Sequence, residues 1–110
     1  MKQYVVDELR PGDYDVLKTY LDEHLEFAGL DDLYWKSIDD TLLTRRQAAH
    51  TQCAPFYFAL VLTPESLSCE LLVRARNRIR CDCIAYATTE QRNWIVGWVD
   101  GVLEELGITV

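Results

Sequence analysis

Four cysteines and two histidines are the residues of this chain with the widest chemical use. His50 and Cys53 are three positions apart, and Cys81 and Cys83 form a Cys-x-Cys pair. One imidazole and three thiolates are a ligand set that zinc accepts, and His50-x-x-Cys53 has the spacing of half a zinc knuckle. A Cys-x-Cys pair is a weaker signal than two Cys-x-x-Cys pairs. A zinc- or cysteine-dependent site at these four residues is therefore one hypothesis.

Reduced cysteines also pack as small apolar residues, and the sequence favours this second interpretation. Apolar stretches at 67–75 and 79–87, joined by a short connection, predict a hairpin. The register set by that connection places Cys69 and Cys83 opposite Ala85 and Leu71. We therefore expect cysteines in the core, with no cofactor and no metal.

A catalytic cysteine is not indicated. Cys53 with His50 as its base would need a lowered thiol pKa, but Cys53 is expected at the end of a helix, where the helix dipole disfavours a thiolate. Glycine-rich nucleotide loops, the serine-hydrolase elbow and the His-Glu-x-x-His motif are all missing from the sequence. The residues thus predict no catalytic site, argue against an enzyme and identify no known family.

A run of arginines surrounds the expected hairpin turn: Arg74, Arg76, Arg78 and Arg80. The hairpin register places Arg74 and Arg80 directly opposite each other, which is unfavourable unless water or an anion lies between them. Guanidinium groups bind carboxylates and phosphates with paired hydrogen bonds. The run is interpreted either as a solvated turn relieved by Glu70 and Asp82, or as a binding site for an acidic protein, or as one for nucleic acid or another anionic ligand.

The last expected helix carries a second candidate surface. Its sequence places Trp94, Gly97, Trp98 and Gly101 on one stripe. Glycine destabilises a helix by about 1 kcal/mol relative to alanine, so two glycines suggest close approach of another backbone. Tryptophan is enriched in interface cores, and a partner protein or a second copy of the chain could pack here.

The pattern of apolar residues and turn signals predicts the order β-α-β-α-β-β-β-α. Hairpin-length connections favour antiparallel pairing, so we expect an α+β fold with a mostly antiparallel five-stranded sheet and helices packed on one face. Asp13 is expected to cap the first helix, and Thr88-x-x-Gln91 is a capping box for the last one. The expected strands span 3–9, 33–38, 56–63, 67–75 and 79–87, and the expected helices span 14–28, 41–51 and 88–106.

Length and charge limit the classes of function. A chain of 110 residues fits one domain. The formal net charge of −7 arises in residues 1–40, and an acidic chain is repelled by nucleic acid at long range. The start of the chain is not typical of a signal peptide, and no apolar stretch has the length of a membrane span, so we expect a cytoplasmic protein. The favoured hypothesis is a non-catalytic protein-interaction domain, which binds either a partner protein or a second copy of the chain as a homodimer.

Overall fold

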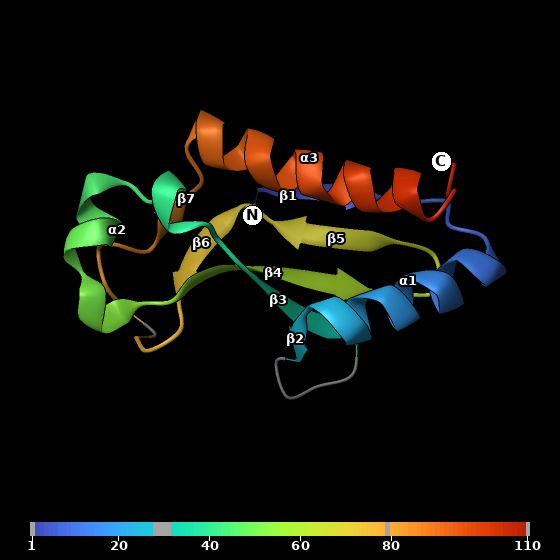
Figure 1. Ribbon diagram of the computed structural model, residues 1–110, viewed down its shortest axis with the longest axis horizontal. Coiled ribbons are helices and arrows are strands. Elements are labelled where there is room, and N and C mark those ends of the chain that lie inside the picture. Colours follow the sequence, from blue (N-terminus) through green and yellow to red (C-terminus); the bar gives the residue numbers. More distant parts are fainter. Residues whose placement is uncertain (1, 28–31, 79, 110) are drawn as a thin grey trace.

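The computed structural model describes residues 2–27, 32–78 and 80–109. Helices and strands alternate in the first half, and a strand-rich region precedes the long last helix (Figure 1). The strands are β1 (Gln3–Val6), β2 (Glu26–Phe27), β3 (Leu33–Ser37), β4 (Phe56–Leu62), β5 (Leu67–Glu70), β6 (Leu72–Ala75) and β7 (Ala85–Tyr86). The helices are α1 (Pro11–His24), α2 (Arg45–Ala49) and α3 (Thr89–Glu105), with 3₁₀ turns at Asp40–Leu42 (η1) and Thr51–Cys53 (η2).

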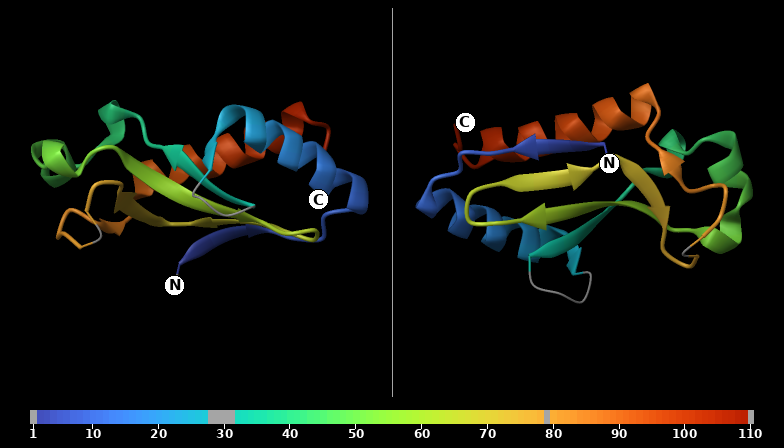
Figure 2. Two further views of the ribbon diagram at one scale, coloured as in Figure 1. Left: turned by 90° about the horizontal axis from the view of Figure 1, so that it is seen from below. Right: turned by 180° about the vertical axis from the view of Figure 1, so that it is seen from behind.

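The strands form an open antiparallel sheet in the order β1-β5-β4-β3-β2. Strand β6 pairs with the other half of β4, and β7 pairs with β6. Helices α1 and α3 lie on the same side of this sheet (Figure 2). The predicted α+β class, the antiparallel pairing and the packing of helices on one face are confirmed. The strand count differs, because β2 was not expected and the stretch 67–75 is divided.

Alternation along β4 explains the two faces of the sheet. Its side chains at even positions are buried against the helices, whereas Tyr57 and Ala59 are half-buried and Val61 is exposed on the other face. Helix α1 packs Leu17 and Leu21 against the buried face of the sheet, and α3 packs a set of apolar residues against the same face. Burial of each such side chain stabilises the fold by about 1.5–3 kcal/mol. The core residues of β4 and α3 are Phe56, Phe58, Leu60, Leu62, Ile95, Val99, Val102 and Leu103.

Local signals place both ends of α3 as the sequence predicts, whereas the start of α1 differs. Thr88 Oγ1 accepts a hydrogen bond from Gln91 N, while the Gln91 side chain accepts one from Thr88 N, so the capping box of α3 is confirmed. Gly107 follows α3 with a φ of 72°, a left-handed conformation that suits glycine. The expected cap of α1 is wrong. Arg10 occupies the cap position and Asp13 lies inside the first turn, because Pro11 has the fixed φ that starts a helix.

The expected helix over 41–51 is also interrupted. Asp39 accepts a hydrogen bond from Thr41 N and starts η1, and Thr44 then caps a new helix, α2, with Gln47 at the third position. The two capping residues thus divide the expected helix into η1 and α2, and η2 follows them. In the part of the chain that the structure describes, no helix is both long and apolar enough to cross a membrane.

The expected hairpin is the main departure from the sequence interpretation. Strand β6 ends in a tight turn in which Ala75 pairs with Arg78, and only Ala85 and Tyr86 return to the sheet. Cys69 consequently lies opposite residues of β1 and β4 instead of Ala85, and Cys83 lies outside any strand. The long hairpin would have held two arginines face to face, which is unfavourable. Positions 28 and 79, at the ends of two expected elements, lie outside the described residues.

Candidate metal centre

The four cysteine and histidine residues that could bind zinc come together in space. His50 follows α2, Cys53 lies in η2, and Cys81 and Cys83 belong to the segment between β6 and β7. We call these four side chains the Cys/His centre. Their ligand atoms all lie within 4.8 Å of one another. In a tetrahedral zinc site the sulfurs are about 3.8 Å apart and nitrogen and sulfur about 3.5 Å apart, so a contraction of an ångström or less completes the site.

The first half of the centre is set by the end of α2. Cys53 N donates a hydrogen bond to His50 O at 2.9 Å, which closes η2. This single turn brings the side chains of His50 and Cys53 to the same side of the backbone. Its position is in turn held by α2, whose first turn is closed by reciprocal bonds between Thr44 and Gln47.

A second tight turn sets the other half. Ile84 N donates to Cys81 O at 3.0 Å, and the intervening residues bring the Cys81 and Cys83 thiols together. Asn77 joins the two halves, because its side-chain amide donates to Ala54 O at 2.6 Å. Figure 1 shows the segment after β6 beside α2, at one end of the molecule.

Two buried glutamines connect the centre to the rest of the fold. Gln47 Nε2 donates to Cys83 O at 3.3 Å, and Gln91 Nε2 donates to Gln47 Oε1 at 3.0 Å. Both glutamines are at most 2% exposed. Both also close the capping boxes of their helices, so the N-terminal ends of α2 and α3 and the Cys83 backbone form one hydrogen-bonded unit. The Thr44-x-x-Gln47 pattern was a signal for this unit that the sequence interpretation did not use.

The thiols of the centre have different proton affinities. Hydrogen bonds from the backbone N–H and the thiol of Cys83 lower the pKa of Cys81 to about 7. Burial, followed by hydrogen bonds that the Cys83 thiol donates to Cys81 and Cys53, raises the pKa of Cys83 to about 12. A cation among them favours the thiolate forms of both. The arrangement therefore offers a metal ion one thiol that ionises readily and one that must lose its proton on binding.

Cys69 stands apart from the other cysteines. It is 1% exposed in β5, and burial raises its pKa to about 12. The prediction of a core cysteine is confirmed for Cys69. Cys53 and Cys83 are also buried, but they line the Cys/His centre as well as the core.

The arginines do not form the arrangement that the sequence predicts. Arg74 pairs with Tyr57 of β4, and on the other edge of β6 strand β7 pairs only with Leu72 and Val73, so Arg80 is not opposite Arg74. Two guanidinium nitrogens of Arg74 donate to Glu70 at 2.7 and 3.2 Å. Arg76 pairs with Glu26 and lies over the ring of Trp35, 5.1 Å from its centroid.

The other two arginines, Arg78 and Arg80, are exposed. The expected relief of Arg74 by Glu70 is confirmed, whereas Asp82 pairs with Arg46 instead. Anion binding by the arginine run stays a prediction.

The tryptophan stripe of α3 is partly engaged within the chain. The Trp94 ring lies 6.3 Å from that of Phe58, and Lys36 Nζ lies 4.9 Å from the centroid of Trp98. Gly97 and Gly101 are exposed, and a Cβ at either position would meet nothing within 4 Å. The close backbone approach suggested by the glycines is thus not made within the described part of the chain. A partner interface on this stripe stays a prediction.

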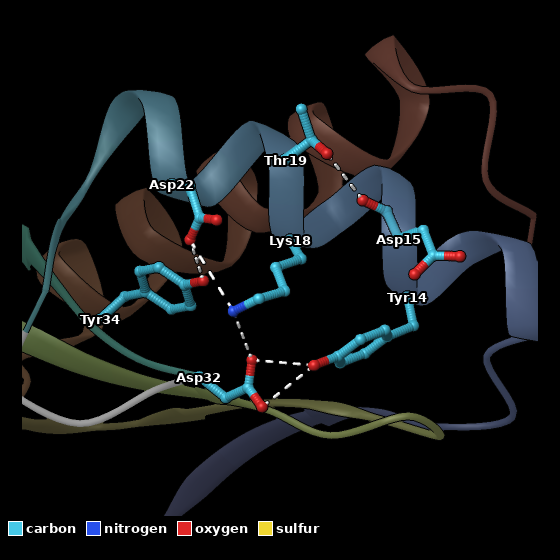
Figure 3. Close-up of polar contacts among 7 residues, drawn as sticks. All are labelled: Tyr14, Asp15, Lys18, Thr19, Asp22, Asp32 and Tyr34. Carbon is cyan, nitrogen blue, oxygen red and sulfur yellow. Dashed lines mark hydrogen bonds and ion pairs between the residues drawn. The ribbon is translucent and has the colours of Figure 1, made fainter.

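A polar cluster that the sequence interpretation missed joins α1 to β3 (Figure 3). Lys18 Nζ lies 3.0 Å from Asp32 and 4.0 Å from Asp22. Tyr14 donates to Asp32, and the buried Tyr34 donates to Asp22 at 2.5 Å. Because both carboxylates are hydrogen-bonded and share the Lys18 ammonium within the cluster, it is suited to fastening α1 onto the sheet. The pair Lys18 and Asp22, four residues apart on α1, was the available signal.

Comparison with known proteins offers no relative from which to transfer a function. No protein-family model, curated protein or solved structure that was compared with this chain matches it. The function is therefore argued from the geometry of the Cys/His centre and of the surface.

Proposed function

We propose that this protein is a small zinc-binding domain that acts by binding another protein and not by catalysis. The observation that carries the zinc proposal is the convergence of His50, Cys53, Cys81 and Cys83, whose ligand atoms lie within 4.8 Å of one another. Two separate turns, 28 positions apart at their nearest members, contribute two ligands each. Such convergence is what a structural metal site requires.

The ligand types favour zinc over other metals. Thiolates with one imidazole suit zinc, whereas magnesium and calcium prefer oxygen ligands. A set of three cysteines and one histidine in tetrahedral arrangement is among the usual structural zinc sites. Zinc bound here would clamp the turn at Cys81–Cys83 to the end of α2, and so order the segment between β6 and β7.

The completeness of the ligand set supports a structural role. Catalytic zinc sites keep one position for water or substrate, and here four protein side chains satisfy a tetrahedral ion. Cys53 and Cys83 are each 1% exposed, so a substrate would have little access to the metal from their side. A closed centre leaves the protein's activity to its surface, which is consistent with an interaction domain.

The test of the zinc proposal is the metal content of the untagged protein. We expect one zinc per chain by native mass spectrometry, with the ion lost on denaturation. Cobalt(II) substitution should give the visible absorption of a tetrahedral ion and the near-ultraviolet bands of thiolate ligands. The change Cys81→Ser should reduce both, and Cys69→Ala provides a matched control, since Cys69 lies outside the centre.

The outcomes separate the alternatives. A protein that binds neither zinc nor cobalt(II) at micromolar concentration contradicts the metal proposal and leaves the cysteines as core residues. Equal metal loss in Cys69→Ala and Cys81→Ser indicates that unfolding, not ligation, controls the metal. Octahedral cobalt(II) spectra contradict the closed tetrahedral site.

A further inference from the structure

One face of the sheet has no helix upon it. Helices α1 and α3 cover the opposite face, and within the described residues no helix crosses the side seen in the right-hand view of Figure 2. We call this side the open sheet face. Of the four large apolar side chains that are most exposed, Val5 (43%) and Val61 (42%) lie on this face, and Tyr86 (44%) pairs with Leu72 at its margin.

A row of paired side chains crosses four strands of the open sheet face, with Ser68 as its polar member. Val5 pairs with Ser68, Ser68 pairs with Val61, and Val61 pairs with Leu33. These four residues therefore form one row across β1, β5, β4 and β3. Paired side chains on one face are about 5 Å apart, so the row is a contiguous surface and not a set of isolated residues.

Beside this row lies an aromatic pair. Trp35 and Tyr57 are 4.7 Å apart between ring centroids, and both are half-buried. Two hollows flank the pair, one of about 320 Å³ that includes Leu33 and Ala59, and one of about 240 Å³ that includes Arg78 and Ile84. Knobs and hollows of this size allow interdigitation with a second surface.

Two arginines on the open sheet face are paired with glutamates. Arg74 pairs with Glu70 and Arg76 pairs with Glu26, whereas Arg78, at the smaller hollow, is an additional exposed cation. The two ion pairs by themselves attract neither a strongly acidic nor a strongly basic partner. They match a copy of the same face, since a two-fold axis can place each arginine near a glutamate of the other copy.

We propose that the open sheet face is a homodimer interface, in which two copies pack sheet against sheet. This inference rests on the proposed interaction function and names its surface and its partner. The five strands β1, β5, β4, β3 and β2 hold 22 residues, and at about 3.4 Å per residue and about 4.8 Å between strands they present roughly 360 Å² of flat area. Because side chains make the surface uneven, two such faces bury about 1,000 Å² in total. This area is near the lower limit for a specific interface, so we expect a dissociation constant in the micromolar range.

Two valines provide a matched test. Val61 on the open sheet face and Val16 on α1 have the same exposure, 42%, so a glutamate at either position meets similar solvent. Sedimentation velocity of the full chain, from about 1 to about 200 µM, measures the dimer fraction. We expect wild type and Val16→Glu to dimerise alike, and Val61→Glu to stay monomeric with unchanged far-ultraviolet circular dichroism. A Trp35→Ala variant should weaken association at least tenfold.

Other outcomes overturn the inference in distinguishable ways. A wild-type monomer at every concentration excludes the homodimer. A dimer that resists Val61→Glu but is lost in Val16→Glu or Trp98→Ala places the interface on the helices and refutes the sheet-to-sheet arrangement. Zinc content measured on the same samples is independent of these results, so failure of the dimer and failure of the metal centre are separate findings.

Discussion

His50 Nδ1 lies 3.1 Å from Cys81 Sγ, although 31 positions separate the two residues along the chain. This contact joins the turn after α2 to the turn before β7. The two turns do not pair in a sheet, and hydrogen bonds from Asn77 and Gln47 link the segments that carry them. If zinc occupies the Cys/His centre, the ion adds a further link and should make this end of the molecule better ordered.

Removal of the metal should lower thermal stability. A ligand that binds only the folded state stabilises it in proportion to the logarithm of its concentration over its dissociation constant, about 4 kcal/mol at a thousandfold excess. We expect EDTA to lower the melting temperature and to speed amide hydrogen exchange between β6 and β7, with little change in α3. Differential scanning calorimetry and hydrogen exchange measure these effects. Identical melting with zinc and with EDTA contradicts the prediction.

Metal binding should release protons in a pH-dependent way. At pH 8 the Cys81 thiol, with a pKa of about 7, is already ionised in the metal-free protein, whereas Cys83, with a pKa of about 12, is protonated. Below pH 7 zinc must displace the Cys81 proton as well, so affinity should fall and proton release should rise. Titration calorimetry at pH 6 and pH 8, in buffers of different ionisation enthalpy, counts the protons. Equal release at both values argues against the site.

The change Gln47→Leu should destabilise the fold by about 1–3 kcal/mol, because it leaves Cys83 O and the Gln91 amide without this buried hydrogen-bond partner. Zinc affinity should fall too, since Gln47 positions the backbone of a ligand. Gln52→Leu, at an exposed position, is the control. Urea denaturation and competition with a zinc chelator give the two values. Equal effects of the two variants contradict this role.

The change Tyr34→Phe should remove an alkaline transition. Burial and the hydrogen bond to Asp22 raise the Tyr34 pKa from 10.0 to about 12. A raised pKa means that the stabilisation is complete below pH 10 and is lost as pH rises towards 12. We expect Tyr34→Phe to be less stable by about 1 kcal/mol at pH 8, with the difference shrinking above pH 10. Tyr86→Phe, at an exposed position, should show neither effect in thermal melts.

Much of the architecture could be predicted because its signals are local. The unbroken apolar run of β4 and the Thr88–Gln91 box of α3 depend on neighbours within a few positions. These patterns determine which segments are strands and helices, and the short connections favour antiparallel pairing. The α+β class follows from such signals alone.

The sequence did not determine how distant segments pair and contact one another. Strand β6 pairs with β4 along one edge and with β7 along the other, and the return strand is limited to Ala85 and Tyr86, so Arg80 does not face Arg74. The Cys/His centre could be described as a ligand set, but whether two turns bring it together depends on buried contacts such as Gln47 to Cys83. The sequence by itself determined the elements and the ligand types. Tertiary structure decided their convergence and the open sheet face, because both arise from long-range packing that no local pattern encodes.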